Sequence, residues 1–304
     1  MRKASIMSDD IIYRNYAVAF IDVLGQKELF KNFNTDSLRD DDPRLIDVHK
    51  QTALFIEHLR EGFENFFKSF SESPKLESQV QVPESKRKQF VEVNKSEIKT
   101  YRFSDSILAF TPLQTEKYHS IAINGVYGIL MACGAMMIIS LFLRKPFRAA
   151  IDVGLGTDLS NGEVYGPVSY KVYELENKIA QYPRIVVGDE LCSYLYSLSK
   201  EIRQLPEQEE IDIKLCKNLA DVCLKMIIRD LDGQAILDYL GSNFRNNLGN
   251  AKLEGGMTEE KLIGKAFQFV EEEYNKKKKM GDRKLALRYF LLYNYFKAKT
   301  QAKK

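Results

Sequence analysis

The first strand is predicted from an unbroken run of apolar residues near the start of the chain. Residues 17–21 are all apolar, the run ends at Asp22, and Gly25 follows three positions later. A short continuous apolar run bounded by a turn signal is typical of a strand that is buried on both faces. We therefore expect this strand to carry the Asp22 carboxylate to its end, at a sharp turn.

Two further strands are predicted around a second aspartate. Residues 98–103 and 106–111 are strand-like, and Ser104 and Asp105 stand between them as in a tight hairpin. If these strands lie beside the first one, Asp22 and Asp105 converge at one edge of a sheet.

Helical spacing of apolar residues predicts a long amphipathic helix over 45–70, whose phenylalanines we expect in the core. Residues 71–97 are charged and interrupted by proline, and we interpret them as an inserted loop or hairpin. A long helix is expected over 116–143, after the two strands. The elements expected beyond it are strands at 147–154, 162–166 and 184–187, a helix at 168–181, helices on either side of an acidic linker at 203–212, a β-hairpin near 226–239, and closing helices at about 258–277 and 281–300.

The order of these elements predicts the fold. Strand, helix, two strands, helix and strand is the ferredoxin-like pattern. We therefore expect an α+β protein with a mainly antiparallel sheet and flanking helices. We assign 1–188 to this core and 189–304 to a helical C-terminal extension that contains the β-hairpin.

One segment also fits a membrane helix. Residues 121–143 are nearly unbroken apolar sequence, long enough to span a bilayer, and basic residues follow. Against a span, Asn124 and Ser140 are polar, and Asp22 and Asp105 would be separated from everything that follows. We expect a buried or interface helix and no membrane partner, and purification without detergent would exclude the alternative.

Composition narrows the class of protein. The chain has 304 residues, 44% of them hydrophobic, so it can bury a full core, and its net charge of +3 is too balanced to predict nucleic acid as a partner. The four cysteines form no C-x-x-C pair, which favours reduced thiols, a cytoplasmic protein and no structural zinc. The lysine run at 276–279 is expected on a solvated helix face, with phosphate or nucleic-acid contact as the alternative.

The two aspartates are the candidate chemistry. Carboxylates with a backbone carbonyl between them are hard oxygen ligands, the kind that Mg²⁺ uses when it also binds substrate phosphates. For Asp22 alone, capping of the following helix is an equally good interpretation. Asp105, in a hairpin of its own, favours a metal site.

These motifs resemble those of a known enzyme family. The run 20–25, Phe-Ile-Asp-Val-Leu-Gly, is similar to the first metal-binding motif of class III nucleotidyl cyclases, Ser104-Asp105 is similar to their second, and the match covers about 16–188. Other runs resemble more closely the pyrimidine cyclases of bacterial Pycsar anti-phage defence. These runs are Gly166-Pro167, Tyr173-Glu174-Leu175-Glu176 and residues 180–185. The tail of the broader group, which includes uncharacterised relatives of these cyclases, is similar to Asp230-Leu231-Asp232-Gly233, Arg288-Tyr289-Phe290 and Tyr293-Asn294.

The resemblance implies a class III cyclase core and a homodimer with its active sites at the subunit interface. It implies Mg²⁺ or Mn²⁺ bound by Asp22, Asp105 and the main-chain carbonyl of Val23, and attack of a ribose 3′-oxygen on the α-phosphate with pyrophosphate leaving. Gly25 would let backbone amides approach the phosphate tail. A dimer is also expected because the two aspartates would otherwise lack a wall that holds the base.

Base selection is predicted from departures from purine cyclases. The resemblance places Tyr101 where those enzymes have a lysine, and Glu163 at a second base-reading position. Arg148 resembles an arginine near the base in pyrimidine-cyclase relatives, and it could donate to the 2-carbonyl that uracil and cytosine share. We expect UTP or CTP as substrate, with packing of Tyr101 and ion pairing of Arg148 as the alternatives.

A second departure concerns the transition state. Tyr170 and Glu174 occupy the positions of the asparagine and arginine that stabilise it in many purine cyclases, and neither can replace them. Lys171, Lys178 and Arg184 are close in sequence. We name Lys171 and Arg184 as candidate catalytic cations, with a surface role as the alternative.

The sequence thus predicts an enzyme that makes cUMP or cCMP as a signal for a separate effector in anti-phage defence. A catalytically silent, cyclase-like dimer that binds nucleotide or a partner is one alternative. A purine cyclase is the other.

Overall fold

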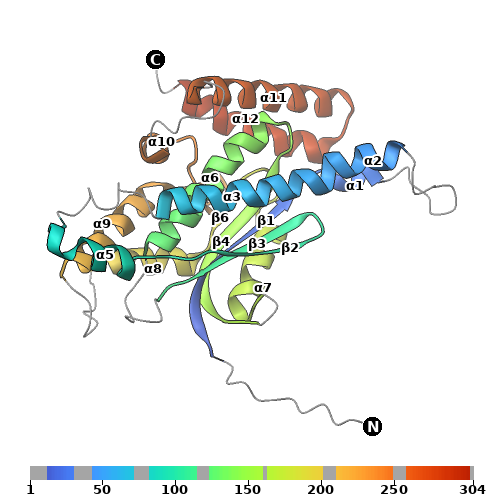
Figure 1. Ribbon diagram of the computed structural model, residues 1–304. Helices are drawn as coiled ribbons and strands as arrows, with labels where there is room; N and C mark the ends of the chain where they lie inside the picture. The colour runs from blue at the N-terminus through green and yellow to red at the C-terminus, as the bar shows by residue number, and fades with distance from the viewer. Residues whose placement is uncertain are drawn as a thin grey trace, which may run out of the picture.

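The computed structural model describes residues 12–30, 43–71, 82–114, 123–159, 163–200, 210–248 and 258–301. Figure 1 shows a central sheet with the long helices α3, α6, α11 and α12 on one side and α7 on the other.

The strands are β1 (Arg14–Val23), β2 (Lys99–Phe103), β3 (Ser106–Pro112), β4 (Phe147–Asp158), β5 (Val164–Tyr165), β6 (Ile185–Val187), β7 (Ile227–Arg229) and β8 (Ala235–Leu237). The helices are α1 (Gln26–Phe30), α2 (Pro43–His49), α3 (Phe55–Ser71), α5 (Arg87–Val93), α6 (Ile123–Phe142), α7 (Pro167–Glu174), α8 (Asp189–Lys200), α9 (Glu210–Lys225), α10 (Ser242–Leu248), α11 (Glu259–Lys279) and α12 (Arg283–Gln301). Two π-helical turns, η2 (Lys50–Leu54) and η4 (Leu175–Ile179), and one 3₁₀ turn, η3 (Glu84–Lys86), continue into or out of helices.

The sheet has the strand order β2-β3-β1-β4-β6-β8-β7, and β5 pairs with the end of β4. Neighbouring strands are antiparallel, except that β4 and β6 are parallel. From β1 to β4 the elements follow the β-α-β-β-α-β order of the ferredoxin-like motif. The predicted α+β fold, with a mainly antiparallel sheet and C-terminal helices, is confirmed.

Strand β1 is apolar at successive positions because both of its faces are buried. It lies between β3 and β4. Ala19 and Ile21 belong to the main core with α3 and α6, whereas Tyr16 and Val18 belong to a smaller cluster with α7. A strand covered on both faces needs apolar side chains at odd and even positions, so the apolar run ends where the strand reaches the edge of the core, at Asp22.

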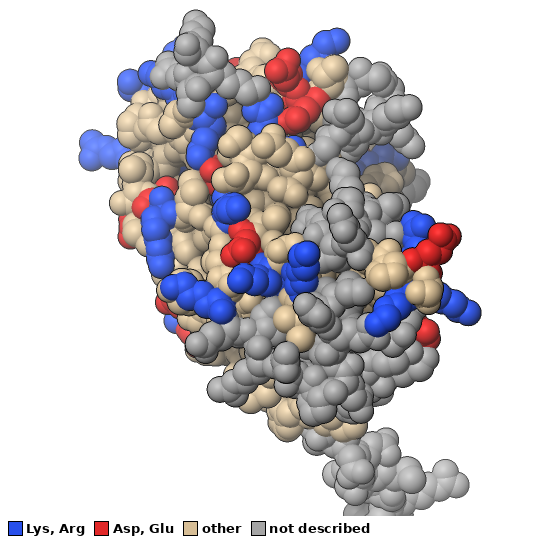
Figure 2. All heavy atoms as spheres, turned by 90° about the vertical axis from the view of Figure 1, so that its left-hand side faces the viewer, with Lys and Arg blue, Asp and Glu red and all other residues tan. Residues whose placement is uncertain are grey.

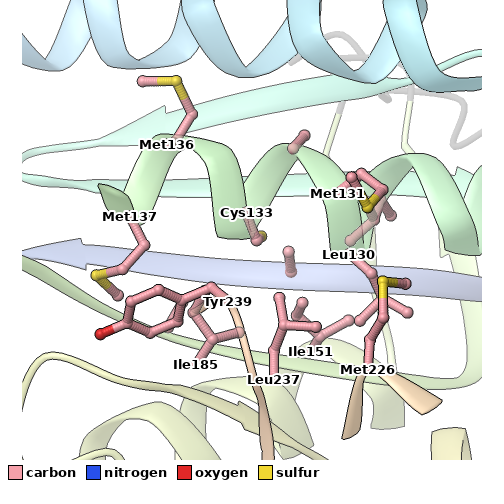
Figure 3. Close-up of a cluster of buried hydrophobic side chains, with 14 of the residues drawn as sticks. Leu130, Met131, Cys133, Met136, Met137, Ile151, Ile185, Met226, Leu237 and Tyr239 are labelled. Carbon is pink, nitrogen blue, oxygen red and sulfur yellow. The ribbon is translucent and has the colours of Figure 1, made fainter. Parts of the chain in front are cut away.

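Helix α6 is apolar on all sides because it is enclosed on all sides. It packs against α3, α11 and the sheet, and 89% of its most apolar stretch is buried inside the protein. Figure 3 shows Cys133 and Met137 of α6 on the side that faces Ile151 and Leu237 of the sheet. Among the described helices α6 alone is long and apolar enough to cross a membrane, and its burial favours the expected interior helix.

The close packing of α6 predicts opposite effects at two helical glycines. A Cβ atom at Gly134 would lie 2.3 Å from the ring of buried Phe244, whereas nothing lies within 4 Å of a Cβ at Gly264 in α11. We expect Gly134→Ala to lower the free energy of unfolding by about 1–3 kcal/mol through overpacking. Gly264→Ala should raise it by up to about 1 kcal/mol through helix propensity. Urea unfolding measures both, and shifts of the same sign would contradict this packing.

The inserted segment differs from its expected structure. Residues 84–93 form η3 and α5, where the charged sequence of 71–97 predicted a loop or hairpin. Phe90 of α5 is buried in the main core. A tertiary contact therefore stabilises a helix that is too short and polar to be recognised from its pattern. Residues 72–81 of this segment lie outside the described part of the chain.

The sheet crosses the boundary that we placed after residue 188. Strand β8 pairs with β6, and β7 pairs with β8. The hairpin predicted near 226–239 is therefore part of the same sheet as the core. The division into 1–188 and 189–304 stays a prediction about the chain, and no break in the sheet marks it.

Charged side chains of both signs are scattered over the face that Figure 2 shows. Neighbouring charges of opposite sign largely cancel at a distance.

Candidate functional site

The two aspartates meet where β1 ends and the β2–β3 hairpin turns. The backbone N–H of Val23 donates to the carbonyl of Asp105 at 3.1 Å. The turn is tight because Ser104 adopts a left-handed backbone with φ of 53°. Gly25, with φ of 88°, lines the same cavity of about 690 Å³ as both carboxylates. The structure thus brings Asp22 and Asp105 together, as the strand pattern predicted.

Arg148 is the direct neighbour of Asp22 across β1 and β4. Its Nε and Nη2 atoms donate to one carboxylate oxygen of Asp22 at 3.2 and 3.1 Å. The Ser106 hydroxyl donates to the other oxygen at 3.2 Å. Arg148 is therefore an ion-pair partner of a candidate metal ligand.

A third acid, Glu176, completes this cluster and was not selected from the sequence. It lies on the π-helical turn η4 and is 2% exposed. Its Oε1 atom is 2.5 Å from Nε of Arg148. π-Helical turns are frequent at functional sites. Glu176 belongs to the run 173–176, which resembles pyrimidine cyclases. That resemblance is the sequence signal by which it could have been identified.

Burial, and next to it the crowding of these acids, raises the pKa values of Asp22 and Glu176. Burial raises the pKa of Asp22, Arg148 opposes this, and nearby Asp105 adds to it. Burial also raises the pKa of Glu176 to about 7, again against Arg148 and with the help of the two aspartates. Ionised acids this close repel each other. The cluster therefore favours either a bound proton or a bound cation.

Glu176 gives the protein a pH dependence of definite sign. Its native pKa of about 7 lies above the ordinary 4.5, so the native state holds a proton that the unfolded state releases. This contribution to the free energy of unfolding is complete below pH 4.5 and is lost as the pH rises to about 7. Without divalent ions, we expect stability to fall over this window and Glu176→Gln to flatten the fall. Denaturant titrations across the window test this, and an identical profile in the variant would contradict the raised pKa.

The donor set suits a divalent cation that also takes other ligands. In the described part of the chain, no three or more His, Cys, Asp or Glu side chains are grouped for metal binding. Asp22, Asp105 and the main-chain carbonyl of Val23 are hard oxygen donors. Mg²⁺ is commonly bound by one or two carboxylates together with substrate phosphates, and Mn²⁺ accepts the same donors. The residues therefore fit either ion when a phosphorylated molecule is bound with it.

The structure also brings together the two residues predicted to read a base. Tyr101 on β2 donates a hydrogen bond to the carboxylate of Glu163, next to β5, and this bond raises the pKa of Tyr101. Neither residue lines the cavity that contains Asp22. Within one chain, the predicted base-reading residues Tyr101 and Glu163 thus lie apart from the cavity of the predicted metal-binding residues.

Lys171, named as a candidate catalytic cation, lines a different cavity, of about 640 Å³. Its Nζ atom is 3.3 Å from Asp152 and 3.1 Å from Glu190. Asp152 is fully buried and accepts a hydrogen bond from the backbone N–H of Leu191, in the first turn of α8. Lys171 thus balances the charge of a buried carboxylate that caps a helix.

Arg184, the other candidate cation, is 4% exposed and fastens the β7–β8 turn to the sheet. It donates to Asp230 at 2.5 Å and to Asp232 at 2.7 Å. The Tyr182 hydroxyl donates to the same Asp230 carboxylate, and the guanidinium lies 4.7 Å from the centre of the Tyr182 ring. Arg184 does not line the cavity that contains Asp22.

The cavity around Asp22 is instead rich in cations that the sequence alone did not bring together. The α11–α12 turn lies at the same side of the molecule as the β2–β3 turn (Figure 1). The closing helices therefore wall the site within one chain, so the absence of a wall is no longer a reason to expect a dimer. The basic residues that line the cavity are Arg144 and Lys145 after α6, Arg148 on β4, Lys276 and Lys277 on α11, and Arg288 on α12.

No protein-family model matches this chain, and no curated protein matches it. Among solved structures it is similar to a class III adenylyl cyclase-like ATP-binding protein from Pseudomonas aeruginosa, with 12% sequence identity and a TM-score of 0.33. The match covers 69% of this chain and 40% of that one, so the chain spans less than half the length of its neighbour. Because so weak a likeness decides nothing about function, we argue function from the residues of the site.

Proposed function

We propose that this protein is a nucleotidyl cyclase that converts a pyrimidine nucleoside triphosphate, UTP or CTP, to its 3′,5′-cyclic monophosphate and pyrophosphate. One observation carries the proposal. Asp22 and Asp105 converge from two strand ends into a single cavity whose other polar residues are mainly basic. Paired carboxylates beside cations suit a divalent ion and the phosphates of a nucleotide.

In the proposed chemistry, the metal ligands, Gly25 and Arg148 have separate roles. Mg²⁺ or Mn²⁺, held by Asp22, Asp105 and the carbonyl of Val23, would lower the pKa of the ribose 3′-hydroxyl and offset the charge of the phosphates. Gly25 leaves room for phosphate oxygens to approach backbone N–H groups. Arg148, fixed by Asp22 and Glu176, supplies a positive charge at the phosphate end.

The choice of a pyrimidine base rests on Tyr101 and Glu163. Their hydrogen bond replaces the lysine-containing arrangement that the resemblance associates with purines. Arg148 pairs with Asp22 and Glu176. This favours a role at the phosphates over the base contact that we expected from the sequence.

A homodimer is part of the proposal. Tyr101 and Glu163 lie outside the cavity of their own aspartates, so one nucleotide could contact both groups only if a second copy supplied one of them. Large aromatic side chains are exposed on α7, on the neighbouring strand β5 and on the β2–β3 hairpin. They include Phe103 at 72%, Tyr165 at 66% and Tyr170 at 64%. Aromatic side chains are enriched at protein interfaces, so these residues are available for contact with a second copy.

The biological setting is proposed from the resemblance alone. It would be a cytoplasmic role in anti-phage defence, in which the cyclic nucleotide activates a separate effector. No contact in the chain bears on that setting.

The test is incubation of the purified protein with ATP, GTP, CTP or UTP and Mn²⁺, with products resolved by mass spectrometry. A single cyclic pyrimidine nucleotide would support the proposal in full. Cyclic AMP or cyclic GMP would keep the cyclase and overturn the interpretation of Tyr101. No cyclic product from a folded protein would overturn the proposed activity.

A second candidate function is a silent nucleotide-binding dimer. The observation that favours it is on α7. There Glu174 forms an ion pair with Lys178, and Tyr170 hydrogen-bonds to Glu174. These residues occupy the positions of transition-state groups in purine cyclases, and they satisfy each other instead. Tight nucleotide binding without turnover would identify this function.

A further inference from the structure

The C-terminal helices contribute charge to the cavity around the two aspartates. Its walls carry more basic than acidic side chains. The acidic ones are Asp22, Asp105 and Glu273, and the basic ones are Arg144, Lys145, Arg148, Lys276, Lys277 and Arg288. Three of the six cations come from α11 and α12. An excess of positive charge that lines one concave surface attracts anions.

Arg288 is one of the least compensated of these cations. It is half-buried, and it forms no hydrogen bond or ion pair with any other described residue. Burial lowers the pKa of Arg288, and neighbouring Arg148 lowers it further, against a smaller opposing effect of the Asp282 carboxylate. Arg148 is already paired with Asp22 and Glu176. A second guanidinium beside it, partly removed from water, is unfavourable unless an anion lies between the two.

The two lysines are also under-compensated. Nζ of Lys276 is 3.7 Å and Nζ of Lys277 is 3.9 Å from oxygens of the same residue, Glu273. One carboxylate thus faces two ammonium groups at distances too long for hydrogen bonds. Lysines are favoured at the C-terminal end of a helix such as α11 because of its dipole. That preference does not account for Arg288, which lies within the first half of α12.

We propose that Lys276, Lys277 and Arg288 bind a polyphosphate chain, the di- or triphosphate of a nucleotide, beside the aspartates of the same subunit. The identity of the ligand as a nucleoside triphosphate rests on the proposed function. The binding of polyphosphate itself does not. Arg288 on α12 then supplies a cation that Tyr170 and Glu174, on α7, cannot supply.

The test is calorimetric binding of inorganic tripolyphosphate to the full chain in EDTA, which removes metal ions and nucleotide chemistry from the measurement. The wild type should bind. Charged hydrogen bonds are strong enough that Arg288→Gln should weaken binding by about tenfold or more. The double variant Lys276→Gln, Lys277→Gln should behave likewise. Arg288→Lys should keep most of the affinity. Arg283→Gln, an exposed change on the same helix that does not line the cavity, should bind as the wild type does.

Failure of this inference differs from failure of the proposed function. No binding to the wild type, or equal binding by Arg288→Gln with an unchanged melting temperature, would overturn the polyphosphate site. Binding that depends on Arg288, in a protein that yields no cyclic nucleotide, would support the site and overturn the cyclase. Cyclic product from Arg288→Gln with an unchanged KM would support the cyclase and overturn the site.

Discussion

Asp22→Asn and Asp105→Asn are each expected to abolish cyclic-nucleotide formation while the protein stays folded. Each change removes one of the two carboxylates available to a divalent ion at the end of β1. Stabilisation of transition-state charge by a metal is worth several kcal/mol, which corresponds to a loss of about a thousandfold or more in rate. Asp105→Asn should not lower stability greatly, because it relieves the repulsion between Asp22 and Asp105 that helps to raise the pKa of Asp22. Asp22→Asn relieves the same repulsion but loses the charge of the ion pair with Arg148, which keeps Glu176 as a partner, so this variant should be less stable than Asp105→Asn and still fold.

A matched control is available outside the site. Asp47 is an exposed carboxylate on α2 that accepts a hydrogen bond from Gln51 at 2.7 Å. Asp47→Asn should keep the activity of the wild type. Rates are measured by mass spectrometry of the product, and circular dichroism verifies folding. Wild-type rates in Asp22→Asn and Asp105→Asn would exclude a metal-binding role for the pair.

The largest loss of stability is expected for Arg184→Gln. Its guanidinium is almost fully buried and binds Asp230 and Asp232, so its removal leaves a partly buried carboxylate without its partner. Breaking a buried ion pair from one side typically lowers the free energy of unfolding by about 3–5 kcal/mol. The β7–β8 hairpin should loosen with it, because the same contacts fasten its turn to the sheet.

Urea unfolding, with activity measured in parallel under native conditions, separates a structural role from a catalytic one. Arg229→Gln is the matched control, since Arg229 lies on the same hairpin and is exposed. It should change the free energy of unfolding by less than about 0.5 kcal/mol. If Arg184→Gln unfolded at the urea concentration of the wild type and lost activity, Arg184 would be the catalytic cation that the sequence suggested.

The fold was predictable where apolar periodicity and turn signals agree. Residues 17–21 of β1 and most of α6 are apolar because each element is enclosed by others, and such runs are recognisable without a structure. Helix α5 was missed for the opposite reason. Its sequence is charged, and nothing in the sequence shows that its residue Phe90 packs into the core.

The site was predictable in part, for a reason that lies in strand geometry. Asp22 and Asp105 end or join neighbouring strands, so pairing of β1 with β3 brings them together. The partners of Lys171 come from β4 and α8, and those of Arg184 come from the β7–β8 turn. No local sequence pattern connects these elements. Arg288 is likewise distant in sequence from the aspartates, and only the packing of α12 places it in their cavity.

The most direct measurement of the central claim is Mn²⁺ binding, followed by electron paramagnetic resonance, in the presence of a 3′-deoxynucleoside triphosphate that cannot be cyclised. The account predicts that the wild type removes more of the free Mn²⁺ signal than the nucleotide alone does, and that Asp22→Asn and Asp105→Asn remove no more than the nucleotide alone. Equal Mn²⁺ binding by the wild type and both variants would contradict the account, because the two carboxylates would then hold no metal.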